Sequence, residues 1–155
     1  MLMKFELKSD KFLHNDMIPH RFGCKGKGIS PPLRWQGDPK QTKSFALIMQ
    51  DLDTPLTNLT HWILYNIPSD QTMLSESIPG QETFSNGMIQ AKNSMRKNEY
   101  MPPCPPFGKH QYVFTLYALD HVLKADPKMN KKKLLKKMNG HILAESELHG
   151  FYSKK

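Results

Sequence analysis

Three apolar runs of strand length, each bounded by turn-forming residues, are the feature that most limits how this chain can fold. They cover residues 44–49, 61–67 and 112–119 and are rich in β-branched and aromatic side chains, which favour strands. Because each run is apolar at consecutive positions, we expect both faces of each strand to be buried in the centre of a sheet. Twelve prolines in 155 residues argue against an architecture of long helices.

The segments around these runs carry turn and loop signals. Residues 15–43 and 92–110 are rich in Gly, Pro and Lys and are predicted to be ordered loops. Asn86-Gly87 lies between apolar residues and is typical of a tight hairpin turn.

The C-terminal third changes character. Apolar residues at helical spacing predict a helix that starts near Asn130, with Leu134, Leu135 and Met138 facing the core and lysines facing solvent. Residues 141–148 are predicted to continue as helix. The sequence thus predicts one domain over residues 1–155, a mostly β fold and most simply a sandwich, with a C-terminal helical segment.

The net charge of +8 is concentrated in one segment. Residues 122–139 hold seven lysines and one acid, whereas the rest of the chain is nearly balanced. A solvated helix face explains such a run, and a membrane surface contacted through lysines 131–137 is an alternative. The chain has no nucleic-acid module signature, so we do not expect nucleic acid as a partner.

Compartment and cysteine chemistry are linked. The N-terminus lacks the apolar stretch of a secretory signal, and no run is long enough to span a bilayer, so we expect a cytoplasmic protein. Thiols stay reduced there, which predicts that Cys24 and Cys104 are free, with a redox-sensitive pair as the alternative.

Polar residues gather at the margins of the three runs. Asp51 and Asp53 follow the first run, His61 opens the second, and His110 and Tyr112 enter the third. Acids and imidazoles that share the margins of core strands are candidates for a functional site.

A proline cluster lies between the second and third runs. Residues 102–106 read Pro-Pro-Cys-Pro-Pro, so Cys104 has the only main-chain N–H among them. We expect a stiff apolar wall, suited to one face of a ligand pocket.

The same residues carry a family resemblance along nearly the whole chain. Its motifs are Ile18-Pro19, Cys24-Lys25-Gly26, Gly28 to Trp35, Asp51 to Pro55, His61 to Pro68, Pro103 to Pro106, His110 to Tyr112, Tyr117 to Asp120 and Gly140 to Glu145. In this order and spacing they resemble the phosphatidylethanolamine-binding protein family, in its bacterial and archaeal Raf-kinase-inhibitor-like branch.

The resemblance implies a β-sandwich of antiparallel sheets, with a C-terminal helix beside a small anion pocket. By position, the pocket motifs fall on Asp51, Asp53, His61, Pro105, Pro106, His110 and Tyr112. It implies binding of phosphate-like groups, including phospholipid head groups and phosphorylated side chains. Regulation of a protein partner is a further hypothesis, which the resemblance alone does not imply. The resemblance implies no cofactor, no metal and no firm catalytic turnover.

Two departures from the family pattern lie close to this pocket. Leu52 stands where a proline is usual between the two acids, and Gln111 replaces an arginine that is common between the histidine and the tyrosine. A basic residue is therefore missing near the predicted pocket.

The predicted chemistry has one main form and two alternatives. We expect Asp51 or Asp53 to orient His61, so that His61 and His110 face an anion while the Tyr112 hydroxyl and the Cys104 N–H add neutral donors. One alternative is a hydrolase or acyl-transfer enzyme that pairs the Cys104 thiolate with His61 or His110. The other is a metal site built from the two histidines and one aspartate.

Overall fold

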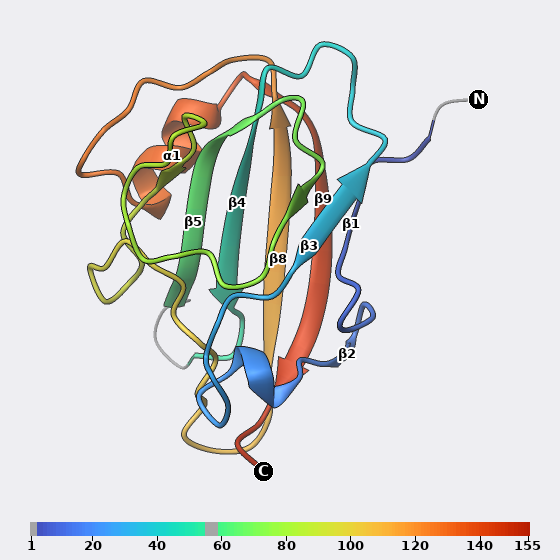
Figure 1. Ribbon diagram of the computed structural model, residues 1–155, viewed down its shortest axis with the longest axis vertical. Coiled ribbons are helices and arrows are strands. Elements are labelled where there is room, and N and C mark those ends of the chain that lie inside the picture. Colours follow the sequence, from blue (N-terminus) through green and yellow to red (C-terminus); the bar gives the residue numbers. More distant parts are fainter. Residues whose placement is uncertain (1–2, 55–58) are drawn as a thin grey trace.

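The computed structural model describes residues 3–54 and 59–155, which form two packed sheets (Figure 1). The larger sheet has the order β2 (Asp16–Met17), β9 (Ile142–Tyr152), β8 (His110–Leu119), β4 (Ser44–Asp51), β5 (Leu59–Pro68) and β7 (Ile89–Gln90). The smaller sheet has the order β1 (Glu6–Lys8), β3 (Leu33–Gln36) and β6 (Met73–Leu74). A short 3-10 helix, η1 (His20–Phe22), and the helix α1 (Lys131–Met138) complete the elements.

The three apolar runs are confirmed as the central strands β4, β5 and β8, which pair antiparallel. The larger sheet is mixed, because β2 pairs parallel to β9. Alternate residues of β4 point to opposite faces: Phe45, Leu47 and Met49 join the core between the sheets, while Ala46 and Ile48 join a second core that includes residues of α1. Two cores explain why these runs are apolar at every position.

Helix α1 begins where the sequence predicts. The Asn130 side chain caps it by accepting a hydrogen bond from the Lys133 N–H at 2.9 Å. Leu134 and Met138 are buried, four residues apart on one helix face, but Leu135 is 39% exposed, so its inward placement was wrong. No helix in the described residues is long and apolar enough to cross a membrane.

The prediction that helix continues through residues 141–148 was wrong, because this segment belongs to β9. Asn139 caps α1, and Gly140 then reverses the chain with a φ of +86°, a conformation that suits glycine. β9 pairs with β8 along its whole length, from Leu119 opposite Ile142 to His110 opposite Tyr152. Long-range pairing here overrides a local composition that favours helix.

The loop predictions were only partly correct. Residues 15–43 contain β2, η1 and β3, short elements that apolar periodicity does not reveal. The tight turn at Asn86-Gly87 is present: Gly87 has a φ of +96°, and the Phe84 N–H donates to the Met88 carbonyl at 3.0 Å.

The α1 packing gives a direct stability prediction. Leu134→Ala is expected to lower the free energy of unfolding by about 2–5 kcal/mol, because it removes a buried side chain from the second core. Leu135→Ala, the matched control one residue away, is expected to change it by less than about 1 kcal/mol. Urea denaturation of both variants measures the difference, and equal effects would contradict the observed helix orientation.

Candidate functional site

A cavity of about 420 Å³ lies where β4 ends and where β5 and β8 begin. The register of β4 creates this meeting point, because Asp51 pairs with Leu59 of β5 on one side and with Tyr112 of β8 on the other. Every predicted site residue lines the cavity: Asp51, Asp53, His61, Cys104, Pro105, Pro106, His110 and Tyr112. Pro55, which ends the predicted turn motif, lies outside the described residues.

Asp51 orients His110. His110 Nδ1 lies 2.7 Å from Asp51 Oδ2, and the other carboxylate oxygen accepts the Asp53 N–H at 2.8 Å. Asp51 is buried, and an ionised carboxylate only accepts hydrogen bonds, so His110 carries its proton on Nδ1. The Nε2 atom of His110 is therefore the ring nitrogen left for a ligand.

His61 has a different partner from the one predicted. Its Nδ1 donates to the Met101 carbonyl at 2.7 Å, rather than to Asp51 or Asp53. Burial lowers the pKa of His61 below its usual value, more than the Met101 carbonyl and the Asp51 carboxylate raise it. At neutral pH the ring is therefore uncharged, with its hydrogen on Nδ1 and a lone pair on Nε2.

Tyr112 supplies a buried hydroxyl. Burial and, next, the Asp51 carboxylate raise the pKa of Tyr112 far above its usual range, so the phenol stays protonated. Its ring packs edge-on against His61, with centroids 5.3 Å apart. Asp51 acts on the phenol through its charge and as a neighbouring acceptor that favours the protonated form, although the hydroxyl does not reach full hydrogen-bond geometry with any described residue.

Unpartnered polar atoms concentrate in this cavity. Within the described part of the chain, the buried side-chain nitrogen and oxygen atoms without a hydrogen-bond partner are Trp35 Nε1, His61 Nε2 and Tyr112 Oη. Burying such an atom costs roughly 1–3 kcal/mol, and two of the three line the same cavity. This is the pattern expected of a site that a polar ligand completes.

Asp53 holds the backbone rather than an imidazole. Its carboxylate accepts the Gln111 N–H at 2.7 Å, while the Leu52 N–H donates to the Gln111 carbonyl at 2.9 Å. The side chain of Gln111 bonds to His149 of β9 at 2.8 Å. Gln111, where the resemblance leads one to expect arginine, is thus tied into the sheet.

Cys24 and Cys104 form a disulfide, so the expectation of free thiols was wrong. Two loops that are 80 residues apart in sequence lie side by side, because the Cys24 N–H donates to the Pro103 carbonyl at 3.0 Å. Such a bridge typically stabilises a fold by about 2–4 kcal/mol. While it is intact, the Cys104 sulfur is not available as the thiolate nucleophile of the hydrolase alternative.

The remaining lining of the cavity is mostly apolar. The structure adds Thr54, Leu59, Met101, Pro102 and Phe107 to the predicted residues. Phe107 is 85% exposed at the rim, an unusual position for a large apolar side chain. Sequence reasoning missed Met101 and Phe107, although both flank the proline cluster that it singled out.

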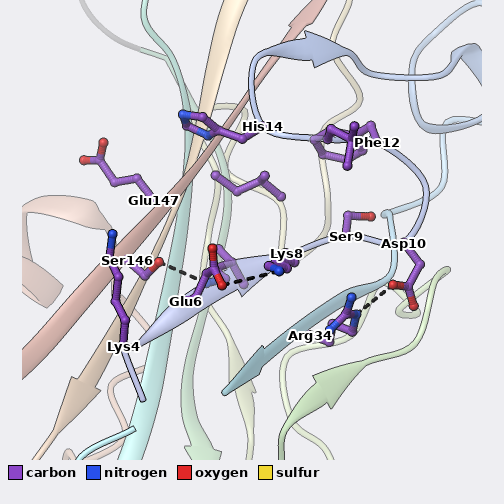
Figure 2. Close-up of a pocket in the computed structure, with 13 residues that line it drawn as sticks. Lys4, Glu6, Lys8, Ser9, Asp10, Phe12, His14, Arg34, Ser146 and Glu147 are labelled. Carbon is purple, nitrogen blue, oxygen red and sulfur yellow. Dashed lines mark hydrogen bonds and ion pairs between the residues drawn. The ribbon is translucent and has the colours of Figure 1, made fainter. Parts of the chain in front are cut away.

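A larger cavity, about 640 Å³, lies elsewhere, between β1 and β9 (Figure 2). Four of its charged side chains form ion pairs within the lining: Lys8 with Glu6 at 3.4 Å, and Arg34 with Asp10 at 2.7 Å. The unpartnered buried atoms noted above lie outside its lining, so the smaller cavity is the stronger candidate. No group of three or more His, Cys, Asp or Glu side chains in residues 3–54 and 59–155 is arranged to hold a metal ion.

Fold and site together define a β-sandwich protein with a small, largely apolar pocket that holds a few polar groups at the ends of its central strands. The sequence profile of the phosphatidylethanolamine-binding protein family matches residues 8–153, and the chain belongs to this family. A UPF0098 protein of Methanothermobacter thermautotrophicus is 44% identical over 148 residues, covering 96% of this chain and 98% of that protein.

Solved structures give the same result. A crystal structure of CT736 from Chlamydia trachomatis, described as a phosphatidylethanolamine-binding protein homologue, has a TM-score of 0.89 at 38% identity and covers 97% of this chain and 98% of its own. Escherichia coli YbcL, described as a member of the mammalian family, has a TM-score of 0.87 at 27% identity and covers 99% of this chain and 100% of its own.

The absence of a hydrogen-bond partner for the Tyr112 hydroxyl can be tested through the free energy of unfolding. Tyr112→Phe is expected to leave the free energy of unfolding unchanged or slightly higher, because it removes an unpartnered buried group. The matched control is Tyr100→Phe, because the Tyr100 hydroxyl donates to the Phe22 carbonyl at 2.6 Å. The control is expected to lose about 1–3 kcal/mol in thermal or urea unfolding. A similar loss for Tyr112→Phe would show that the protein itself satisfies this hydroxyl.

Proposed function

We propose that this protein binds small anions that carry a phosphate-like group, in the cavity lined by Asp51, His61, His110 and Tyr112. The observation that carries the proposal is the pair of buried, unpartnered atoms, His61 Nε2 and Tyr112 Oη, beside the Asp51–His110 pair. Phosphorylated small molecules, phosphorylated side chains and phospholipid head groups share this chemistry.

Each polar group has a distinct role in this proposal. His110, with Nδ1 held by Asp51, presents a charged Nε2–H donor to the anion when the ring is protonated. The Tyr112 hydroxyl donates a second hydrogen bond. His61 Nε2 is an acceptor, since the Met101 carbonyl holds the ring hydrogen on Nδ1, so it pairs with a hydroxyl of the ligand.

One acceptor beside two donors favours a singly protonated phosphate monoester. A monoester monoanion brings a P–OH for His61 and negatively charged oxygens for His110 and Tyr112. A phosphodiester has no such hydroxyl at neutral pH, so its binding requires that His61 itself take up a proton despite its lowered pKa. We therefore propose weaker binding of diesters, while the apolar rim with Phe107 contacts the organic part of the ligand.

The role of Asp51 is tested by the direction of a mutational effect. Asp51→Asn is expected to weaken binding of a phosphate monoester by about tenfold, because the variant loses the carboxylate that holds a proton on His110 Nδ1. Simple electrostatics predicts the opposite, since an acid is removed from an anion site. Asp120→Asn is the matched control, because Asp120 forms the same type of pair with His141 at 2.9 Å outside the cavity. Tighter binding by Asp51→Asn in an NMR titration would show that Asp51 only shapes the turn.

His61 adds a pH dependence of binding to the one that comes from protonation of His110. In the free protein His61 is neutral at pH 7, because its pKa is lowered. A phosphate monoester loses its second proton at about pH 6. The complex holds one proton between His61 Nε2 and the ligand. Above about pH 6 this proton must be taken up, so affinity is expected to fall as pH rises, by up to about tenfold per unit.

The control for this prediction is His61→Asn. Asparagine can keep a donor near the Met101 carbonyl but has no atom at the position of Nε2. The variant is expected to fold, to bind weakly and to lose the part of the pH slope that the His61 proton contributes, whereas the part that comes from protonation of His110 remains. Calorimetric titrations from about pH 6 to 8 measure the slope. The same slope in His61→Asn would assign the proton to another group.

A further inference from the structure

The wall of the anion pocket has few hydrogen bonds of its own. Four of the six residues from 101 to 106 are prolines, which have no N–H to donate. The main-chain bonds of this stretch lie at its beginning: the Met101 N–H donates to the His61 carbonyl at 2.9 Å, and the Pro103 carbonyl accepts from Cys24. Among the described residues, no main-chain bond outside helices and strands involves residues 104–109.

The opposite side of the disulfide is firmly anchored. Around Cys24, the Lys25 N–H donates to the Tyr152 hydroxyl at 3.1 Å, and the N–H groups of Gly23 and Gly26 bond within the loop at 3.0 and 3.1 Å. Tyr152 is fully buried at the end of β9, and Figure 1 shows this end of the chain beside η1. The disulfide therefore links residues 104–109, which have few hydrogen bonds, to the Cys24 loop, which is held in place by Tyr152.

We propose that the Cys24–Cys104 disulfide positions the pocket wall and makes anion affinity depend on its redox state, an inference that rests on the proposed function. Cys104 lines the cavity between Pro103 and Pro105, three residues from the Met101 carbonyl that sets the His61 tautomer. Without the bridge, a ligand has to order residues 104–107 on binding, and this ordering reduces affinity.

Both cysteines are solvent-exposed, so a dithiol reductant can reach the bridge. A thiolate of the reductant attacks one cysteine sulfur, forms a mixed disulfide and releases the other cysteine as a thiolate. The second thiol of the reductant then displaces the first cysteine. The reductant ends as a disulfide, and the two electrons and two protons that it gives up convert the bridge into two cysteine thiols.

The test compares oxidised protein with protein reduced by dithiothreitol. Inorganic phosphate is titrated into each form at about pH 6, and its affinity is measured by NMR. Circular dichroism confirms that the reduced form is folded. We expect reduction to weaken phosphate binding by about three- to tenfold and to shift the ¹⁵N ring signals of His61 in the free protein. The ring signals of His141, which pairs with Asp120 outside the cavity, are expected to stay unchanged.

The double variant Cys24→Ser, Cys104→Ser is the control for the reductant. Its affinity for phosphate is expected to equal that of the reduced protein and to stay the same when dithiothreitol is added. Equal affinity and equal His61 signals in the two redox forms, even with a lower melting temperature after reduction, would overturn the inference and leave a bridge that only stabilises the fold. If oxidised protein binds no phosphate at all, the proposed function is overturned and the inference falls with it.

Discussion

The pairing of β4 with both of its neighbours is the constraint on which the rest of the structure depends. β4 is bonded along its length to β5 on one side and β8 on the other. The alternation of its residues separates the two hydrophobic cores. A shift of one residue in register would exchange the two buried faces and would carry Asp51 away from His110, so packing and the site are fixed by the same hydrogen bonds.

This dependence explains why the sequence could predict which residues lie together around the candidate site. Strands long and apolar enough to be central must end near one another, so the polar residues at their margins, such as Asp51, His61 and His110, converge without any alignment of relatives. The register supplies what the sequence pattern lacks, namely which residues of the three strands are level with one another. The family resemblance identified the same positions independently, through ordered motifs.

What could not be predicted is of a different kind. β9 has a local composition that favours helix, and only pairing with β8 makes it a strand. The partner of His61 is a main-chain carbonyl, that of Met101, and main-chain groups leave no trace in residue identity. The disulfide depends on two loops meeting across 80 residues, whereas the expectation of reduced thiols came from an assumed compartment. All three interactions join segments that are distant in the sequence, and the local residue pattern does not show which distant segments meet.

The anchoring of the Cys24 loop has a consequence for the order of folding. The loop packs on Tyr152, so closely that a side chain at Gly23 would overlap the tyrosine ring, and His20 also bonds to the hydroxyl of Tyr152 at 3.0 Å. Tyr152 follows Cys24 by 128 residues in the sequence. During synthesis the Cys24 loop is therefore made long before the residue that anchors it. Until β9 is paired with β8 the loop lacks this anchor, so the contacts that hold Cys24 opposite Cys104 depend on β9.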